Sequence, residues 1–315
     1  MIAILSIIAP VFGLLAFGLA ARFTPVFDRS AAQALNSFVY HFAIPVLLFR
    51  SLANSDLDAS GGGVLLATFY SGTLAVFLLG MAAARLFFAR RFDHVTILGF
   101  AATFGNSVLI GIPLVLNAFG DRGSFPLFLI ISFHGLILFS VVTLLLEIGQ
   151  GQGQGSQALF AKVFRGLITN PILMSLIVGV IYNRLGFGLA PIVDRWAELV
   201  AQAAVPCALF AAGATLKDFK VSENVAPALT IVFIKCLIHP LIVWSLGTFV
   251  FELRPLFLQV AVLIAAMPTG VNPYLFANRY KVGEAEAAAA ISIGTPLSLL
   301  TVSLFLAFLG VTDGF

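Results

Sequence analysis

The sequence predicts an all-α membrane protein, and two observations carry this prediction. Hydrophobic residues make up 60% of the 315-residue chain and charged residues only 10%, whereas soluble domains average about 25% charged residues. Long, continuously apolar stretches run through the chain, each close to the ~20 residues that a helix needs to cross a bilayer. Transmembrane β-strands are only about ten residues long and alternate in polarity, so these stretches exclude a β-barrel.

Ten stretches qualify as membrane-spanning helices. They are 2–22, 31–53, 62–89, 94–119, 123–148, 163–185, 190–216, 224–251, 255–279 and 284–310. The first stretch has no Lys or Arg before its apolar run, so we interpret it as a retained helix rather than a secretory signal. With the N-terminus outside, the loops carry eleven Lys and Arg residues inside and five outside. The positive-inside rule therefore predicts a multi-pass protein of the inner membrane with both termini in the periplasm.

The chain divides into two related halves, 1–148 and 163–315, joined by a polar, glycine-rich linker at 149–162. Pro10 and Pro45 stand 35 residues apart in the first half, and Pro171 and Pro206 show the same spacing in the second. Five helices per half make the second copy enter the membrane from the opposite side. The pattern therefore predicts an inverted repeat, which is typical of secondary transporters.

The fourth and ninth predicted helices contain residues that break helical structure near the middle of the membrane. These residues are Gly105, Asn106, Gly111 and Pro113 in the fourth helix, and Pro268, Gly270, Asn272 and Pro273 in the ninth. Proline removes a backbone donor and glycine permits unwinding. Two broken helices that cross at the midplane direct the positive ends of their half-helices at one spot, which favours a bound anion. Simple packing kinks are the alternative interpretation.

Lys235 is the one charged residue deep within a predicted span, where an ammonium costs at least ~2.5 kcal/mol to bury. We expect it to face the crossover, where it either attracts an anionic substrate or stands where a cation sits in sodium-coupled carriers of this architecture. A structural lysine bonded to the carbonyls of a broken helix is the alternative. His239 shares its helical face. His134 and His239 are candidates for a proton relay, and the alternative for His134 is a hydrogen-bonded core histidine.

Other function classes have little support in the sequence. It contains no HExxH or GxSxG motif and no paired carboxylates within a span, so no enzyme activity is predicted. Cys207 and Cys236 lack CxxC spacing, so neither a metal nor a cofactor is expected. The basic residues form no patch for nucleic acid. A channel usually shows a filter loop or rings of like charge, and neither is visible, which favours a carrier.

Three segments resemble a known family. They are FGNSVLIGIPLVLNAFG at 104–120, VPCALFAAGATL at 205–216 and MPTGVNPYLFANRYKV at 267–282. They are similar to the fourth, seventh and ninth helices of the auxin efflux carrier family, which includes the plant PIN proteins, and the resemblance runs through the whole chain. Two departures stand out: Gly105 occupies the place of the plant crossover proline, and the long cytosolic loop of many plant members is absent.

The resemblance implies ten helices in two inverted five-helix repeats with crossover helices 4 and 9, as in NhaA and bile-acid transporters. Helices 1, 2, 6 and 7 would form a scaffold that mediates homodimer formation, and helices 3–5 and 8–10 a moving transport domain. Carried over by position, Asn106 is the asparagine beside the substrate and Pro268 is the crossover proline of the ninth helix.

The function predicted from these observations is secondary active or facilitated transport of small organic acid anions. The substrates would be malonate-like, dicarboxylate or auxin-like weak acids, moved by an elevator mechanism in the lipid bilayer. The predicted substrate-binding residues are Gly105, Asn106, Ser107, Lys235, Pro268, Thr269 and Asn272, and the predicted crossover-forming residues are Pro113, Gly270 and Pro273. The sequence leaves open a cation-coupled carrier of another solute class and a channel, as well as the substrate, direction, coupling ion and oligomeric state.

Overall fold

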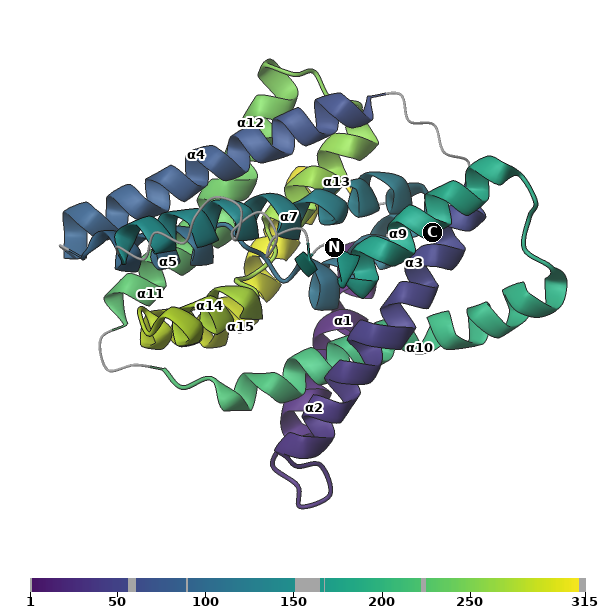
Figure 1. The fold of residues 1–315 in the computed structure, drawn as a ribbon, viewed down its shortest axis with the longest axis horizontal. Coiled ribbons are helices and arrows are strands. Elements are labelled where there is room, and N and C mark those ends of the chain that lie inside the picture. The colour runs from purple at the N-terminus through teal and green to yellow at the C-terminus, as the bar shows by residue number, and fades with distance from the viewer. Residues whose placement is uncertain are drawn as a thin grey trace.

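The structure, a computed structural model, is built from helices (Figure 1). It describes residues 2–55, 61–88, 90–150, 165–166, 168–221 and 225–311. Over these residues the one β-type contact is an isolated bridge between two helix breaks. Apart from Gly149 and Gln150, the predicted linker 149–162 lies outside the described residues.

The first half of the chain forms rods close to the predicted spans, with one exception. Its elements are α1 (Ile2–Ala21), α2 (Arg29–Phe38), η1 (Val39–Ala43), α3 (Ile44–Ala53), α4 (Gly62–Phe88), α5 (Phe92–Ala101), η2 (Ser107–Gly111), α6 (Ile112–Phe119), η3 (Gly120–Gly123) and α7 (Ser124–Gly149). The exception is the predicted fourth helix, 94–119, because α5 ends at Ala101 and helical structure resumes only at Ser107.

The second half is also built from helical rods. Its elements are α9 (Pro171–Leu185), α10 (Pro191–Thr215), η4 (Leu216–Asp218), α11 (Ala226–Phe233), η5 (Ile234–Ile238), α12 (His239–Phe249), α13 (Pro255–Ala265), α14 (Val271–Tyr280) and α15 (Glu284–Phe308). The predicted sixth helix, 163–185, is interrupted before Pro171. The Asn170 side chain accepts hydrogen bonds from the N–H groups of Ile172 and Leu173 and so starts α9.

Three π turns lie inside membrane helices, and each is followed by a proline. The turns η1, η2 and η5 end two residues before Pro45, Pro113 and Pro240, each of which lies in the first turn of the next helix. Proline has no N–H, and its ring clashes with the carbonyl four residues earlier. A wider turn relieves that clash while the helix continues. These prolines therefore sit within continuous rods.

Helix packing is concentrated in two sets of helices (Figure 1). In one set α10 contacts α1, α2 and α3, and α3 also contacts α9; in the other, α4 contacts α5 and α12, and α11 contacts α15. In the first set α1 and α10 cross with their backbones in contact, because Gly18 lies against Phe210 and Gly213 lies against Leu15. Small residues allow this close approach where the hydrophobic effect offers no drive for helix association.

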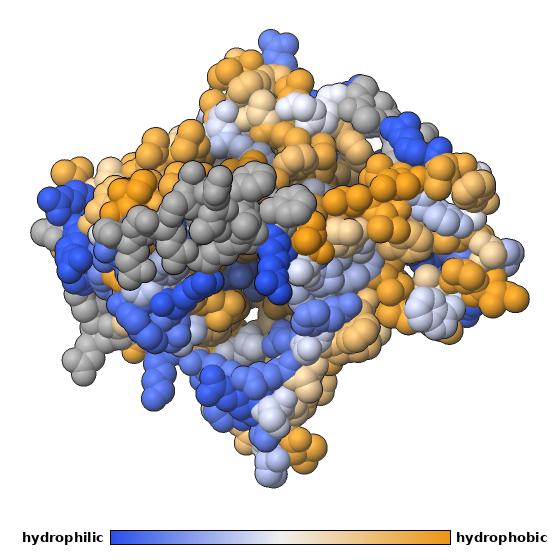
Figure 2. Space-filling view, viewed as in Figure 1, coloured by the Kyte–Doolittle hydropathy of each residue, from blue (hydrophilic) through white to orange (hydrophobic). Residues whose placement is uncertain are grey.

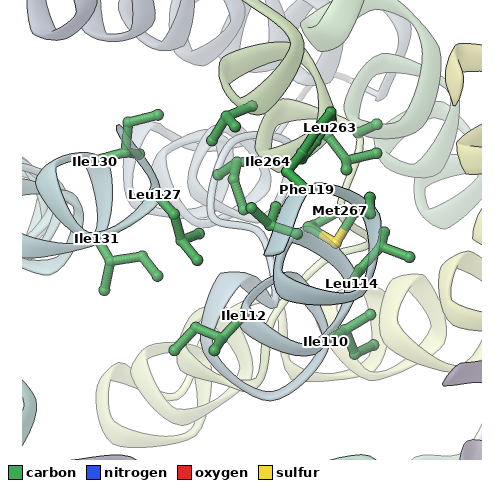
Figure 3. Close-up of a cluster of buried hydrophobic side chains, with 14 of the residues drawn as sticks. Ile110, Ile112, Leu114, Phe119, Leu127, Ile130, Ile131, Leu263, Ile264 and Met267 are labelled. Carbon is green, nitrogen blue, oxygen red and sulfur yellow. The ribbon is translucent and has the colours of Figure 1, made fainter. Parts of the chain in front are cut away.

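The largest hydrophobic core surrounds the second half of the broken fourth helix (Figure 3). Side chains of η2 and α6 pack between residues of α7 and residues that end α13. Ile110 and Leu114 are fully buried there, as are Leu127 on α7 and Leu263 on α13. The two broken helices are thus held together by apolar packing as well as by their backbones.

The outer surface is largely apolar, which fits a bilayer environment. Within the described residues, seven helices are long and apolar enough to span a membrane, and the shorter apolar helices are Phe92–Ala101, Pro171–Leu185 and Pro255–Ala265. Figure 2 shows broad apolar areas over the upper and right parts of the view. The chain is an all-α membrane protein, while the inverted ten-helix arrangement stays a prediction.

Candidate functional site

The two helix breaks pair with each other through an isolated antiparallel bridge. One break follows α5 at residues 102–106, and the other follows α13 at residues 266–270. The N–H of Asn106 donates to the carbonyl of Pro268 at 2.7 Å, and the N–H of Gly270 donates to the carbonyl of Phe104 at 2.9 Å. These bonds flank a bridge between Gly105 and Thr269. Each break thereby provides hydrogen-bond partners for backbone groups of the other, which the hydrocarbon of the bilayer cannot do.

Close backbone approach explains the two glycines at the crossing. A Cβ on Gly270 would lie 3.0 Å from the carbonyl oxygen of Gly105. A Cβ on Gly105 would lie 3.2 Å from the Cβ of Met267 and 3.3 Å from the Nζ of Lys235. All three distances are tighter than ordinary van der Waals contact, so a side chain at either position must displace a neighbour.

The carboxyl ends of the two interrupted helices are capped by side chains from elsewhere in the fold. The hydroxyl of Thr269 donates to the carbonyl of Ala101, the last residue of α5, at 2.9 Å. The ammonium of Lys235 donates to the carbonyl of Ala265, the last residue of α13, at 2.5 Å. A helix carboxyl end carries partial negative charge, so the cation lies where that charge is concentrated.

The amino ends of the resumed helices differ in their capping. The Asn106 side-chain oxygen accepts from the N–H of Leu109 at 3.3 Å and so caps η2. Gly270 precedes α14 and has no capping side chain. Among the described residues the N–H of Val271 and the side-chain amide of Asn272 have no hydrogen-bond partner, and both residues are half-buried. The start of α14 therefore presents donors that an anion can use.

Lys235 belongs to a buried polar chain that connects three helices. Its Nζ lies 3.1 Å from Nδ1 of His239, and Nε2 of His239 lies 3.3 Å from the hydroxyl of Thr73 on α4. Both Lys235 and His239 are 0% exposed. The Thr73 hydroxyl donates to the carbonyl of Phe69 at 2.8 Å. The chain stabilises the ammonium in a site that would otherwise strongly disfavour it.

His134 lies beside the crossing without a polar partner. Its ring is 4.7 Å from that of Phe104, centroid to centroid, and it is almost fully buried. Neither ring nitrogen has a hydrogen-bond partner in the described part of the chain. The interpretation of His134 as a hydrogen-bonded core histidine therefore finds no partner in the structure. The hydroxyl of Ser107, buried at the start of η2, is likewise unpartnered among the described residues.

Most of the predicted site residues meet at this crossing. Contacts at the two breaks bring together Gly105, Asn106, Lys235, Pro268, Thr269 and Gly270. Ser107, Asn272 and Pro273 follow at the starts of the resumed helices. Pro113 lies apart, in the first turn of α6, where it lines an apolar groove of about 260 Å³ between α1, α6 and α10.

Sequence reasoning missed Thr73 and the two capped carbonyls. Thr73 stands in the apolar run of α4 with nothing to distinguish it from nearby Thr68 and Ser71, and its partner His239 lies 166 residues away. Among the described residues no cluster of His, Cys, Asp or Glu suits a metal ion. The buried carboxylates among the described residues are those of Asp93 and Glu286 at the starts of α5 and α15 and of Glu147 near the end of α7, so the charge at the crossing is that of Lys235.

Comparison with known proteins identifies the family to which this chain belongs. A family model described as membrane transport protein matches residues 3–306. The chain belongs to this membrane transport protein family. A protein of Rhizobium meliloti (strain 1021) named for malonate transport is 30% identical over 95% of this chain and 94% of its own length. Auxin efflux carrier component 8 of Arabidopsis thaliana is 22% identical over 90% of both chains.

The uncharacterized transporter YfdV of Escherichia coli (strain K12) is 24% identical over 89% of both chains. The resemblance to the auxin efflux carrier family is therefore confirmed across the chain. As a member of this family the chain is a multi-pass membrane transporter.

Proposed function

We propose that the chain carries small organic acid anions across the membrane by elevator-type alternating access. The observation that carries this proposal is the crossing of the two helix breaks, at which two resumed helices begin. Their amino ends bring partial positive charge to one place. The free donors at the start of α14 make that place suited to a carboxylate.

Each proposed site residue has a role that its position supports. Asn106 and Asn272 hydrogen-bond the carboxylate through their side-chain NH2 groups, since neither NH2 group has a protein acceptor among the described residues and the Asn106 oxygen alone is engaged, by the N–H of Leu109. Ser107 adds its unpartnered hydroxyl. Gly105, Pro268 and Thr269 shape the crossing, and Lys235 supplies positive charge. Relatives named for malonate transport and auxin efflux fit this substrate class, because malonate and auxin are carboxylic acids.

The proposed mechanism rests on an inverted repeat. Residues 101–106 and 265–270 occupy matching places in the two halves, so that Asn106 corresponds to Gly270 and Phe104 to Pro268. The bond from Asn106 to Pro268 then corresponds to the bond from Gly270 to Phe104. This symmetry supports two halves related by a two-fold axis. Numbered by predicted span, helices 1, 2, 6 and 7 contain α1, α2 with α3, α9 and α10, which make up the first packing set. The two packing sets therefore support a scaffold of helices 1, 2, 6 and 7 and a transport domain of helices 3–5 and 8–10.

The proposal includes the setting of the carrier. The excess of loop Lys and Arg on one side supports both termini in the periplasm and the protein in the inner membrane. Homodimer formation through the scaffold is proposed from the family resemblance. A second candidate function is proton-coupled transport, which the unpartnered ring of His134 favours.

The decisive experiment is uptake by proteoliposomes. A panel of labelled mono- and dicarboxylates is offered with and without a pH or sodium gradient, and wild type is compared with Asn106→Ala and Asn272→Ala. Asn278→Ala is the matched control, because Asn278 is exposed near the far end of α14 and bonds Glu284. We expect saturable uptake that both site variants lose and the control retains. Uptake of no acid, or uptake indifferent to both site variants, would overturn the proposal and favour a channel or another solute.

A further inference from the structure

Lys235 does not occupy the anion side of the crossing. Its ammonium bonds the carbonyl of Ala265 at the carboxyl end of α13, whereas the donors for an anion lie at the amino end of α14. The freed carbonyls of a broken membrane helix, at its negative end, are where transporters coordinate cations. The side chain thus places a positive charge where a soluble cation would otherwise be coordinated.

Hydrogen-bond accounting fixes how His239 holds this ammonium. The single proton of the Thr73 hydroxyl is donated to the carbonyl of Phe69, so Thr73 accepts from Nε2–H of His239. Nδ1 is then unprotonated and accepts from Nζ of Lys235. This tautomer is the one that a charged Lys235 requires, because an ammonium only donates. The chain ends at a helix carbonyl, so it orients the ammonium and offers no onward path for a proton through Thr73.

The other break lacks such a charge. Its freed carbonyl, on Ala101, accepts from the neutral hydroxyl of Thr269. Hard cations such as sodium require several oxygen ligands, yet the Ala265 carbonyl is engaged by Lys235 and the described residues hold no acidic cluster for a metal at this place. One break therefore carries a built-in cation and the other carries none.

We propose that the Lys235 ammonium is a tethered cation that replaces a soluble coupling cation, and that His239 and Thr73 are its positioning residues. This inference deepens the proposed anion transport and rests on it. The carrier then needs no sodium gradient, because the positive charge that stabilises the negative helix end travels with the protein. Lys235 acts on the site through the crossing backbone and does not touch the substrate.

Chemical rescue tests the tethered cation directly. Lys235→Ala leaves the Ala265 carbonyl and His239 Nδ1 without their donor and leaves space for a small amine. We expect uptake in this variant to fall by about tenfold or more, since hydrogen bonds to a charged group are lost, and to recover with increasing methylammonium. Lys281→Ala is the matched control, because Lys281 is exposed at the end of α14. Its uptake should equal that of wild type and should not change when methylammonium is added.

Positioning by Thr73 has its own readout. In a Lys235→Ala/Thr73→Val variant the tautomer of His239 is no longer held, so half-maximal rescue should require several-fold more methylammonium than in Lys235→Ala alone. Thr73→Ser retains the hydroxyl and should restore the lower requirement. An unchanged requirement in the Thr73→Val background would show that Thr73 has only a packing role.

A binding measurement separates failure of this inference from failure of the proposed function. Methylammonium should raise the thermal midpoint of Lys235→Ala in detergent, but not that of wild type, whatever the substrate is. Lys235→Met, with an apolar chain of similar length, should fold and show no such shift. Sodium-dependent uptake by wild type, or a folded Lys235→Ala that methylammonium neither stabilises nor restores, would overturn the tethered cation. Absence of acid uptake together with an amine-induced midpoint shift would overturn only the anion function.

Discussion

Replacing Gly213 by alanine should destabilise the contact between α1 and α10. An added Cβ would lie 2.7 Å from the carbonyl carbon of Leu15 and 2.9 Å from its Cα, and closer still to the carbonyl oxygen. Ordinary contacts begin at about 3.4 Å, so the contact with the carbonyl oxygen requires the two backbones to separate by roughly 1.5 Å. Backbone atoms cannot rotate away as a flexible side chain could, so the clash can be relieved only if one helix moves away from the other.

The expected cost follows from two opposing effects. Overpacking of this kind costs typically 1–3 kcal/mol, while Gly→Ala within a helix returns roughly 0.5–1 kcal/mol. The net loss is up to about 2.5 kcal/mol, which corresponds to a midpoint lower by up to about 10 °C on the scale known for large soluble domains. The assay is thermal unfolding of the detergent-solubilised protein followed by the fluorescence of its two tryptophans.

The same helix pair offers an internal control. Gly13 lies on α1, and a Cβ there would meet nothing within 4 Å. Gly13→Ala should therefore leave the midpoint unchanged or raise it slightly. If Gly213→Ala unfolded at the same temperature as Gly13→Ala, the backbone contact between α1 and α10 would not be as close as the structure has it, and the reasoning would fail.

Three further outcomes can be measured by the same thermal assay. Thr269→Val removes the donor to the buried carbonyl of Ala101 and should cost about 1–3 kcal/mol, with Thr269→Ser restoring the loss; an unaltered midpoint would refute this. Arg50→Ala breaks a half-exposed ion pair with Asp194, so the loss should stay within about 1 kcal/mol and should shrink in high salt. Asp28 caps α2, and its carboxylate accepts from the backbone N–H of Ala31 and from a neighbouring hydroxyl, which holds the pKa of Asp28 below its usual range. The cap therefore stabilises the protein fully at pH values above the pKa of Asp28 in the unfolded chain, and this stabilisation is lost as pH falls through the pKa in the folded protein. Asp28→Asn should keep the cap without that loss in acid.

The helix breaks could be predicted because their cause is local. Gly105 and Asn106, and Pro268 and Gly270, lie where the helices stop, since glycine and proline act on the backbone of their own turn. The same reasoning was less successful with Pro113. Nothing in the sequence distinguishes a proline at a break from one that follows a π turn, where the helix continues.

The contacts that give the site its chemistry were beyond sequence reasoning. Lys235 was expected to face the crossover, and a bond to a carbonyl of a broken helix was the alternative; the structure shows such a bond, to Ala265. Neither that partner nor Thr73 could be named in advance, because both lie on other helices and tertiary packing decides which faces meet. The start of α9 escapes prediction for a different reason: the capping signal of Asn170 stands inside an apolar stretch, so the pattern predicts one continuous span.

The pairing of the two helix breaks has a consequence for biosynthesis. The segment around Gly105 is synthesised 164 residues before its partner at Thr269, an interval of about 10–30 s at the usual roughly 5–20 residues per second. Throughout that time the N–H of Asn106 and the carbonyl of Phe104 lack the groups that later satisfy them. During this interval water or the insertion machinery must therefore supply hydrogen-bond partners for these atoms. The crossing forms only after the predicted ninth helix has been inserted.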